Sequence, residues 1–120
     1  GTILNQRGHR NEDEVWGVQS PWCAYYNKNQ EGTLVGALMM TAPDNFRKSW
    51  FHARDYGLLT ANPFGRKAFT DKDKSIISVN PGEHFRLCFG VYIFQADKID
   101  QEWFDSKYSL YQKNIQANND

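Results

Sequence analysis

The sequence lacks an excess of charge of either sign. Its 14 lysine and arginine residues balance 14 aspartate and glutamate residues, so the formal net charge of the 120-residue chain is zero at pH 7. Nucleic acids and anionic membranes attract proteins through surplus positive charge, because the release of counterions drives such binding. The charge balance therefore argues against nucleic acid and membrane as partners.

Long apolar runs are also missing. The longest, LVGALMM at residues 34–40, is far shorter than the ~20 apolar residues that a membrane-spanning helix requires. The first ten residues show no basic start followed by an apolar stretch, so no signal peptide is visible in this chain. Export of the full-length protein to the periplasm or the medium is left open, and the compartment stays unassigned.

Residues that hold metals or cofactors are scarce. The two cysteines, Cys23 and Cys88, form no Cys-x-x-Cys pair, and their apolar surroundings favour buried free thiols, although a disulfide would suit an exported protein. His9, His52 and His84 form no His-x-His or Glu-x-x-His pair. Neither a glycine-rich phosphate loop nor a Gly-x-Ser-x-Gly elbow occurs. We therefore expect no metal site and no cofactor.

What the chain does contain is a series of strand-like segments. Stretches rich in Val, Ile, Phe and Tyr, separated by Gly, Pro and Asn, fill the region from Trp16 to Asp97. We predict a hairpin with strands over residues 22–26 and 33–40, joined by the turn NKNQEG, whose asparagines and glycine tolerate left-handed backbone. The sequence thus indicates an antiparallel β-sheet protein.

Two more strand-like segments follow the hairpin. SIISV at residues 75–79 is expected to form a strand, and EHFRLCFGVYIF at residues 83–94 alternates after an Asn-Pro-Gly turn. The predicted core face of this last run consists of Phe85, Leu87, Phe89, Val91 and Ile93. Its opposite face carries both polar and apolar side chains, which fits a second sheet or a cleft.

The C-terminal stretch changes to a helical period. After Asp100, a candidate N-cap, we expect one amphipathic helix over residues 100–115 whose aromatic stripe serves packing. The overall prediction is a mainly β protein, an antiparallel β-sandwich with one C-terminal α-helix. Its length fits one domain over residues 1–120, or part of a larger one.

The densest group of chemically active side chains lies in WFHARDYGLLTANPFG, residues 50–65. His52 and Asp55 are the catalytic candidates, because a histidine acid with a carboxylate base suits proton transfer near neutral pH. Arg54 is a candidate for substrate binding. In an extended segment His52 and Arg54 share one face and Asp55 points to the other, so convergence requires a bend, which Gly57 could supply. The alternative is that Arg54 and Asp55 form structural ion pairs while His52 binds backbone.

Further candidates could bind a sugar. Trp22 and Trp50 would stack on its C–H face, and Glu14, in an acidic cluster near Trp22, would accept hydrogen bonds from its hydroxyl groups. Asn62, in the sequence NPFG, would point its amide at a hydroxyl group. Each has a structural alternative: aromatic rings in the core, a solvated acidic face, and an asparagine that caps a turn.

Four blocks of the sequence, at residues 5–26, 32–40, 50–65 and 80–87, resemble in this order the C-terminal half of the bacterial PmoA-like family. Members of this family are domains of unknown function labelled "methane oxygenase PmoA". The resemblance covers roughly residues 1–112. Its strongest element lies within residues 50–65, and its support comes from Trp16-Gly17, Trp22, Gly32, Gly36 and Pro81-Gly82-Glu83.

The resemblance implies a galactose-mutarotase-like β-sandwich in longer proteins, so that a missing N-terminal half or a homo-oligomer would complete the chain. It implies carbohydrate binding or modification, mutarotase-like or associated with glycoside hydrolases, with a saccharide as the ligand. The alternative is a non-catalytic structural module that packs on a partner domain or subunit. The family's histidines before Trp50 are replaced by Ala42 and Lys48, which weakens any activity that depends on them. Methane oxidation is not expected without membrane spans.

Overall fold

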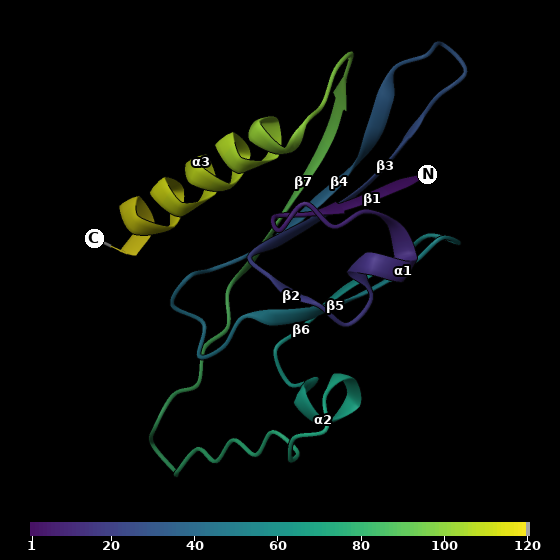
Figure 1. Cartoon of the computed structure of the whole chain (residues 1–120). Helices are drawn as coiled ribbons and strands as arrows, with labels where there is room; N and C mark the ends of the chain where they lie inside the picture. Colours follow the sequence, from purple (N-terminus) through teal and green to yellow (C-terminus); the bar gives the residue numbers. More distant parts are fainter. Residues whose placement is uncertain (120) are drawn as a thin grey trace.

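Seven strands and three helices make up the part of the chain that the computed structural model describes, residues 1–119 (Figure 1). The prediction of a mainly β protein with a C-terminal helix is confirmed, and two short helices are added. In chain order the elements are β1 (Thr2–Asn5), α1 (Asn11–Val15), β2 (Gln19–Ser20), β3 (Trp22–Lys28), β4 (Leu34–Thr41), β5 (Ser49–Arg54), β6 (Leu58–Asn62), α2 (Arg66–Phe69), β7 (Phe89–Ala96) and α3 (Gln101–Asn119).

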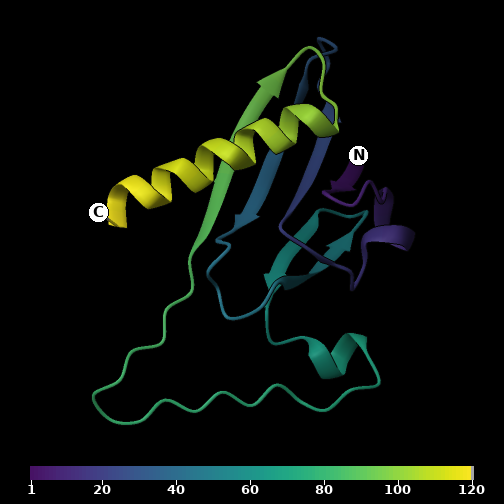
Figure 2. The same cartoon turned by 60° about the vertical axis from the view of Figure 1, so that its left-hand side comes forward.

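The strands form two antiparallel sheets. The four-stranded sheet has the order β1-β3-β4-β7, and the three-stranded sheet has the order β2-β5-β6. Helix α3 crosses one face of the four-stranded sheet, and the three-stranded sheet packs against its other face (Figure 2). The predicted antiparallel β-sandwich is therefore confirmed.

The first hairpin is the centre of the four-stranded sheet. Strands β3 and β4 pair along their whole length. In the turn, the side-chain oxygen of Asn29 accepts hydrogen bonds from the amides of Glu31 and Thr33 at 3.0 and 2.9 Å. Gly32 adopts a φ of 83°, which favours glycine. The predicted hairpin is confirmed, and its first strand extends to Lys28.

One hydrophobic core lies between α3 and the four-stranded sheet. The fully buried ring of Phe104 packs against Trp22 and Tyr26, with ring centroids 5.2 and 5.7 Å apart. The indole N–H of Trp22 donates a hydrogen bond to the carboxylate of Asp105 at 2.9 Å. Apolar burial and one polar anchor together fix the helix on the sheet.

Helix α3 begins where the sequence predicts. The carboxylate of Asp100 accepts a hydrogen bond from the backbone amide of Trp103 at 2.8 Å, which confirms Asp100 as the cap. Trp103, Tyr108 and Tyr111 pack against the core, so the aromatic stripe is a packing face as predicted. The helix continues past the predicted end at residue 115.

A second core fills the space between the two sheets. It contains Ile3, Val15, Cys23, Phe51 and Ala53, all of them at most 1% exposed. Burial raises the pKa of the Cys23 thiol, because the apolar interior disfavours a thiolate. Both cysteines are free thiols as predicted, and Cys23 is buried, whereas Cys88 is half-buried rather than buried.

The predicted core face of β7 is wrong. Phe89, Val91 and Ile93 are 41%, 57% and 74% exposed, whereas Phe94 on the opposite face is 6% exposed and packs against α3. The reason is that α3 covers the face that carries Phe94. On the other face, the three-stranded sheet ends at β6, which lies against β4 rather than β7.

The strand predicted over residues 75–79 is also wrong. Among the strands of residues 1–119, none includes this segment, and it joins neither sheet. The guanidinium of Arg66 instead donates hydrogen bonds to the preceding carbonyl groups of Asp73 and Lys74 at 2.7 and 2.8 Å. A strand-like composition cannot replace the neighbouring backbone that a β-ladder needs.

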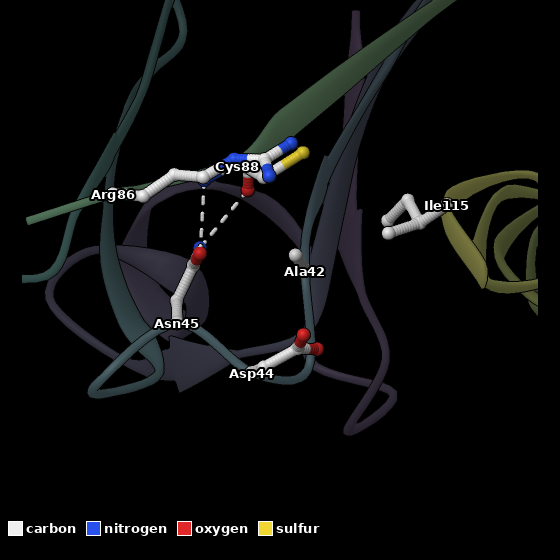
Figure 3. A pocket seen from close by; sticks show the side chains of 6 residues that line it. All are labelled: Ala42, Asp44, Asn45, Arg86, Cys88 and Ile115. Atoms are coloured by element: carbon white, nitrogen blue, oxygen red, sulfur yellow. Dashed lines mark hydrogen bonds between the residues drawn. The ribbon is translucent and has the colours of Figure 1, made fainter. Parts of the chain in front are cut away.

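The last strand begins at Phe89 rather than at residue 83. Just before it, the side chain of Asn45 donates to the carbonyl group of Cys88 at 3.0 Å and accepts from its amide at 2.9 Å (Figure 3). The Cys88 carbonyl also accepts a hydrogen bond from the backbone amide of Ala42 at 3.0 Å, so Asn45 replaces a neighbouring strand only at the Cys88 amide. The alternation over residues 83–88, with Phe85 and Leu87, does not form a strand.

The bond between Trp22 and Asp105 gives a test of how α3 is held. Asp105→Leu should lower the free energy of unfolding by about 1–3 kcal/mol, because the buried indole N–H loses its acceptor. Asp105→Asn keeps an oxygen at this position and should cost less. Urea unfolding followed by tryptophan fluorescence measures both, and equal losses in the two variants would contradict this account.

Candidate functional site

Strand β5 presents alternate side chains to the two faces of the three-stranded sheet. Phe51 and Ala53 are fully buried between the sheets, so His52 and Arg54 lie on the opposite, outer face. The prediction that His52 and Arg54 share a face is confirmed. We call this solvent-facing side of β2, β5 and β6 the outer face.

His52 is held among two aromatic rings and one amide. Its Nε2 lies 3.1 Å from the side-chain nitrogen of Asn62, on the neighbouring strand β6. The rings of Trp16 and Phe69 meet the imidazole edge to face, with centroids 5.2 and 4.6 Å away. Since Asn62 donates its N–H, Nε2 is the accepting nitrogen of a neutral imidazole.

This environment favours the uncharged imidazole. The pKa of His52 is lowered, first because partial burial disfavours the charged ring and second because of the positive charge of Arg54. His52 is therefore neutral at physiological pH. Because Asn62 occupies the accepting Nε2, the neutral imidazole offers its Nδ1–H as a hydrogen-bond donor to a ligand.

Arg54 is fixed by two contacts with the segment that contains α1. Its guanidinium donates to the carboxylate of Glu12 at 2.9 Å, in the one ion pair between side chains of the described chain. It also lies 3.6 Å from the centroid of the Trp16 ring, a cation–π contact. The side chains of Arg54 and Glu12 are 36% and 26% exposed, so the pair contributes little stability and remains open to a ligand.

Asp55 lies at the tip of the β5–β6 hairpin. The amide of Gly57 donates to the carbonyl of Arg54 at 3.1 Å, and Gly57 has a φ of 105°, so a turn does follow Arg54. Within residues 1–119, the Asp55 carboxylate forms no hydrogen bond or ion pair with His52 or Arg54. Its carbonyl group accepts a hydrogen bond from the hydroxyl of Tyr25. Catalysis by His52 together with Asp55 stays a prediction.

The two tryptophans expected to stack on a sugar are interior residues. Trp22 is 0% exposed beneath α3, and Trp50 is 6% exposed with the guanidinium of Arg47 5.8 Å from its ring. Both rings are buried in the described chain, and their stacking on a sugar stays a prediction. A high content of aromatic residues here reflects core packing.

The other two binding candidates have local structural roles. Glu14 accepts a hydrogen bond from the amide of Arg10, the N-cap of α1, at 2.8 Å. The side-chain oxygen of Asn62 accepts from the amide of Phe64 at 2.8 Å, so Asn62 shapes the NPFG turn as its alternative interpretation proposed. Its side-chain nitrogen also reaches His52, so Asn62 alone of these two joins the outer face.

Sequence reasoning missed Trp16 and Phe69 as parts of this site. Gly17 has a φ of 71°, and a Cβ atom there would lie 2.5 Å from the Phe69 ring, so the close approach requires glycine. Beside these rings lies a shallow hollow of about 540 Å³, lined by Trp16, Gly17 and residues 67–71. The Trp16-Gly17 pair was the one local signal of this arrangement.

A separate cavity of about 140 Å³ lies between the start of β7 and the end of α3 (Figure 3). The side-chain amide of Asn45 is used by Cys88, and the Cys88 thiol lies 3.5 Å from the hydroxyl of Tyr111. This leaves Asp44 and Arg86 as the charged groups of the lining, and neither was a predicted site residue. The cavity is large enough for a few water molecules rather than a sugar ring.

The described residues contain neither a metal-binding cluster nor a membrane-spanning helix. Among residues 1–119, no group of three or more His, Cys, Asp or Glu side chains is placed to hold a metal ion. None of the helices in the same part of the chain has the length and apolar character needed to cross a membrane.

Comparison with known proteins gives one match. The model of a family described as "Family of unknown function (DUF6807)" matches residues 1–108. No curated protein and no solved structure matches the chain significantly. The match names neither methane oxygenases nor sugar-binding proteins, so the PmoA-like resemblance stays a prediction.

The lowered pKa of His52 predicts a pH dependence. The unfolded chain binds a proton on this ring near the ordinary pKa of about 6.5, and the folded protein binds it only at lower pH. The stability that His52 contributes is therefore full above about pH 6.5 and is lost as the pH falls through the folded pKa. His52→Gln should lose less thermal stability than the wild type between pH 7.5 and pH 5.

The control is His84→Gln, at an exposed position in the irregular segment before β7. It should follow the wild-type pH dependence. An NMR titration of the imidazole signals gives the midpoint for His52 directly. A midpoint above about 6.5 would contradict the lowered pKa.

Proposed function

The chain belongs to DUF6807, a family of unknown function, and we propose that its outer face binds a saccharide without catalysing a reaction on it. One observation carries the proposal: four planar polar side chains lie beside two aromatic rings on one solvent-facing side of the sheet. The polar groups are Glu12, His52, Arg54 and Asn62, and the rings are Trp16 and Phe69.

This set of groups suits the chemistry of a sugar. Neighbouring hydroxyl groups need donors and acceptors at short spacing, which a guanidinium, a carboxylate, an amide and a neutral imidazole supply. The C–H face of the ring needs an apolar surface. One face of Trp16 is covered by Arg54, so Phe69, beside the 540 Å³ hollow, is the ring that would receive the sugar.

Binding is proposed rather than catalysis because of Asp55. Acid–base chemistry at an anomeric carbon needs both groups within hydrogen-bond reach of the reacting atoms. His52 lies on the outer face between Trp16 and Phe69, whereas Asp55 lies in the hairpin turn. The implied galactose-mutarotase-like fold supports sugar handling only by analogy, and analogy does not assign a reaction.

A second candidate function is that of a structural module, which packs on a partner. A different observation favours it. The outward positions of β7 are apolar and exposed, with Ile93 the most exposed among them, although monomeric proteins seldom expose such a strip on an edge strand. The two functions use different surfaces, so one chain can have both.

Arg54→Gln tests the saccharide proposal. The change removes the charged donor of the outer face but keeps most of its volume, so affinity should fall about tenfold or more. Galactose, glucose, xylose and their linear oligomers are the probes, and NMR titration with tryptophan fluorescence is the measurement. Thermal stability should change little, because the Glu12 pair is partly exposed.

Arg86→Gln is the matched control. It removes the same charge at an exposed position beside the cavity of Figure 3 and should leave affinity unchanged. If none of these sugars shifts the signals of His52 or Trp16, the proposal fails. It also fails if Arg54→Gln and the wild type bind a sugar equally well.

A further inference from the structure

The two sheets of the sandwich differ in width and end unequally on one side. The four-stranded sheet ends at β7 and the three-stranded sheet ends at β6, and each of these strands has only one neighbour. Strand β6 lies against β4, so β7 projects one strand beyond the sheet that it should face. Both strands therefore present unpaired backbone groups along a free edge.

The uncovered side of β7 is apolar. Phe89, Val91 and Ile93 line it, and between β7 and β6 lies a groove of about 240 Å³ whose walls also include Met39 and Leu59. The sequence of β7, FGVYIFQA, contains no charge and no proline. Soluble proteins usually protect an edge strand with charged residues or proline. The absence of both from β7 indicates that another surface covers this strand.

We propose that a second copy of this chain covers it, with β7 of each copy beside β6 of the other. The first layer would then read β1-β3-β4-β7 of one copy followed by β6-β5-β2 of the second. The twofold axis, parallel to the strands, makes the other layer identical. The missing fourth position of each three-stranded sheet is filled by the partner's β7, and every free edge at the interface is paired.

The strand directions fit this arrangement. Strand β6 ends and β7 starts at the end of the sandwich where α2 lies, so the two run in opposite directions (Figure 2). A twofold axis parallel to the strands preserves these directions, so β7 would pair with the partner's β6 in the antiparallel sense. The two β7 strands would face each other across the layers, and Val91 and Ile93 of both copies would form the centre of a dry core.

The charge of the chain is compatible with a second copy as the occupant. The formal net charge is zero, so two copies do not repel each other at long range. The arrangement does not use the outer face, so it goes beyond the proposed saccharide site.

The experiment compares Ile93→Lys with Ile76→Lys by sedimentation velocity. Both isoleucines are largely exposed in the single chain, 74% and 80%, so both variants should fold. The wild type and Ile76→Lys should sediment as dimers, at twice the 13.9 kDa chain mass, and Ile93→Lys as a monomer. Circular dichroism confirms that each variant keeps its sheets.

Hydrogen exchange tests the strand pairing. Amides of β6 and β7 that face the free edges should exchange more slowly in the wild type than in Ile93→Lys, because the partner strand accepts their hydrogen bonds. A wild type that stays monomeric at millimolar concentration overturns the proposal, and so does one that forms aggregates without a fixed stoichiometry. A dimer without added protection in β6 overturns the proposed pairing. A dimer that Ile93→Lys does not weaken places the interface elsewhere.

Discussion

The docking of α3 on the four-stranded sheet is the contact on which the rest of the structure depends. Phe104 packs against Trp22 and Tyr26 and buries one face of that sheet, and Asp105 satisfies the indole N–H that this burial would otherwise leave unpaired. With this face covered, the other face is free to hold the three-stranded sheet. Helix α3 also covers the side of β7 that carries Phe94. The other side of β7 therefore faces the layer of the three-stranded sheet, which has no strand opposite β7.

The sequence was sufficient for the elements that local chemistry determines. The turn after β3 follows from Asn29 and Gly32, and the start of α3 from Asp100, because a side chain within a few residues satisfies the backbone there. Alternation showed that β7 has two different faces but not which one is inside, because that depends on α3 and the second sheet. The strand expected over residues 75–79 failed for a related reason, since this segment joins neither sheet of the described chain.

The candidate site was predictable only in part. His52 and Arg54 share a face because they are two apart on a strand, a relation that the sequence contains. Their partners come from elsewhere: Glu12 from α1, and Phe69 from the end of α2. Tryptophan content alone does not locate the site, because the buried Trp22 and the outer-face Trp16 look alike in the sequence. Contacts between distant segments, rather than composition, decide which ring meets solvent.

The side chain of Asn45 has a wider consequence for the longest irregular segment. It holds the backbone of Cys88 just before β7, and Arg66 holds the carbonyl groups near the other end of the segment. Both ends of residues 75–87 are thus fixed by side chains that do not belong to the segment. The entropy of closing a loop grows only slowly with its length. Related chains can therefore differ in length here without moving the last strand, and this segment is the natural place for the fold to accept insertions.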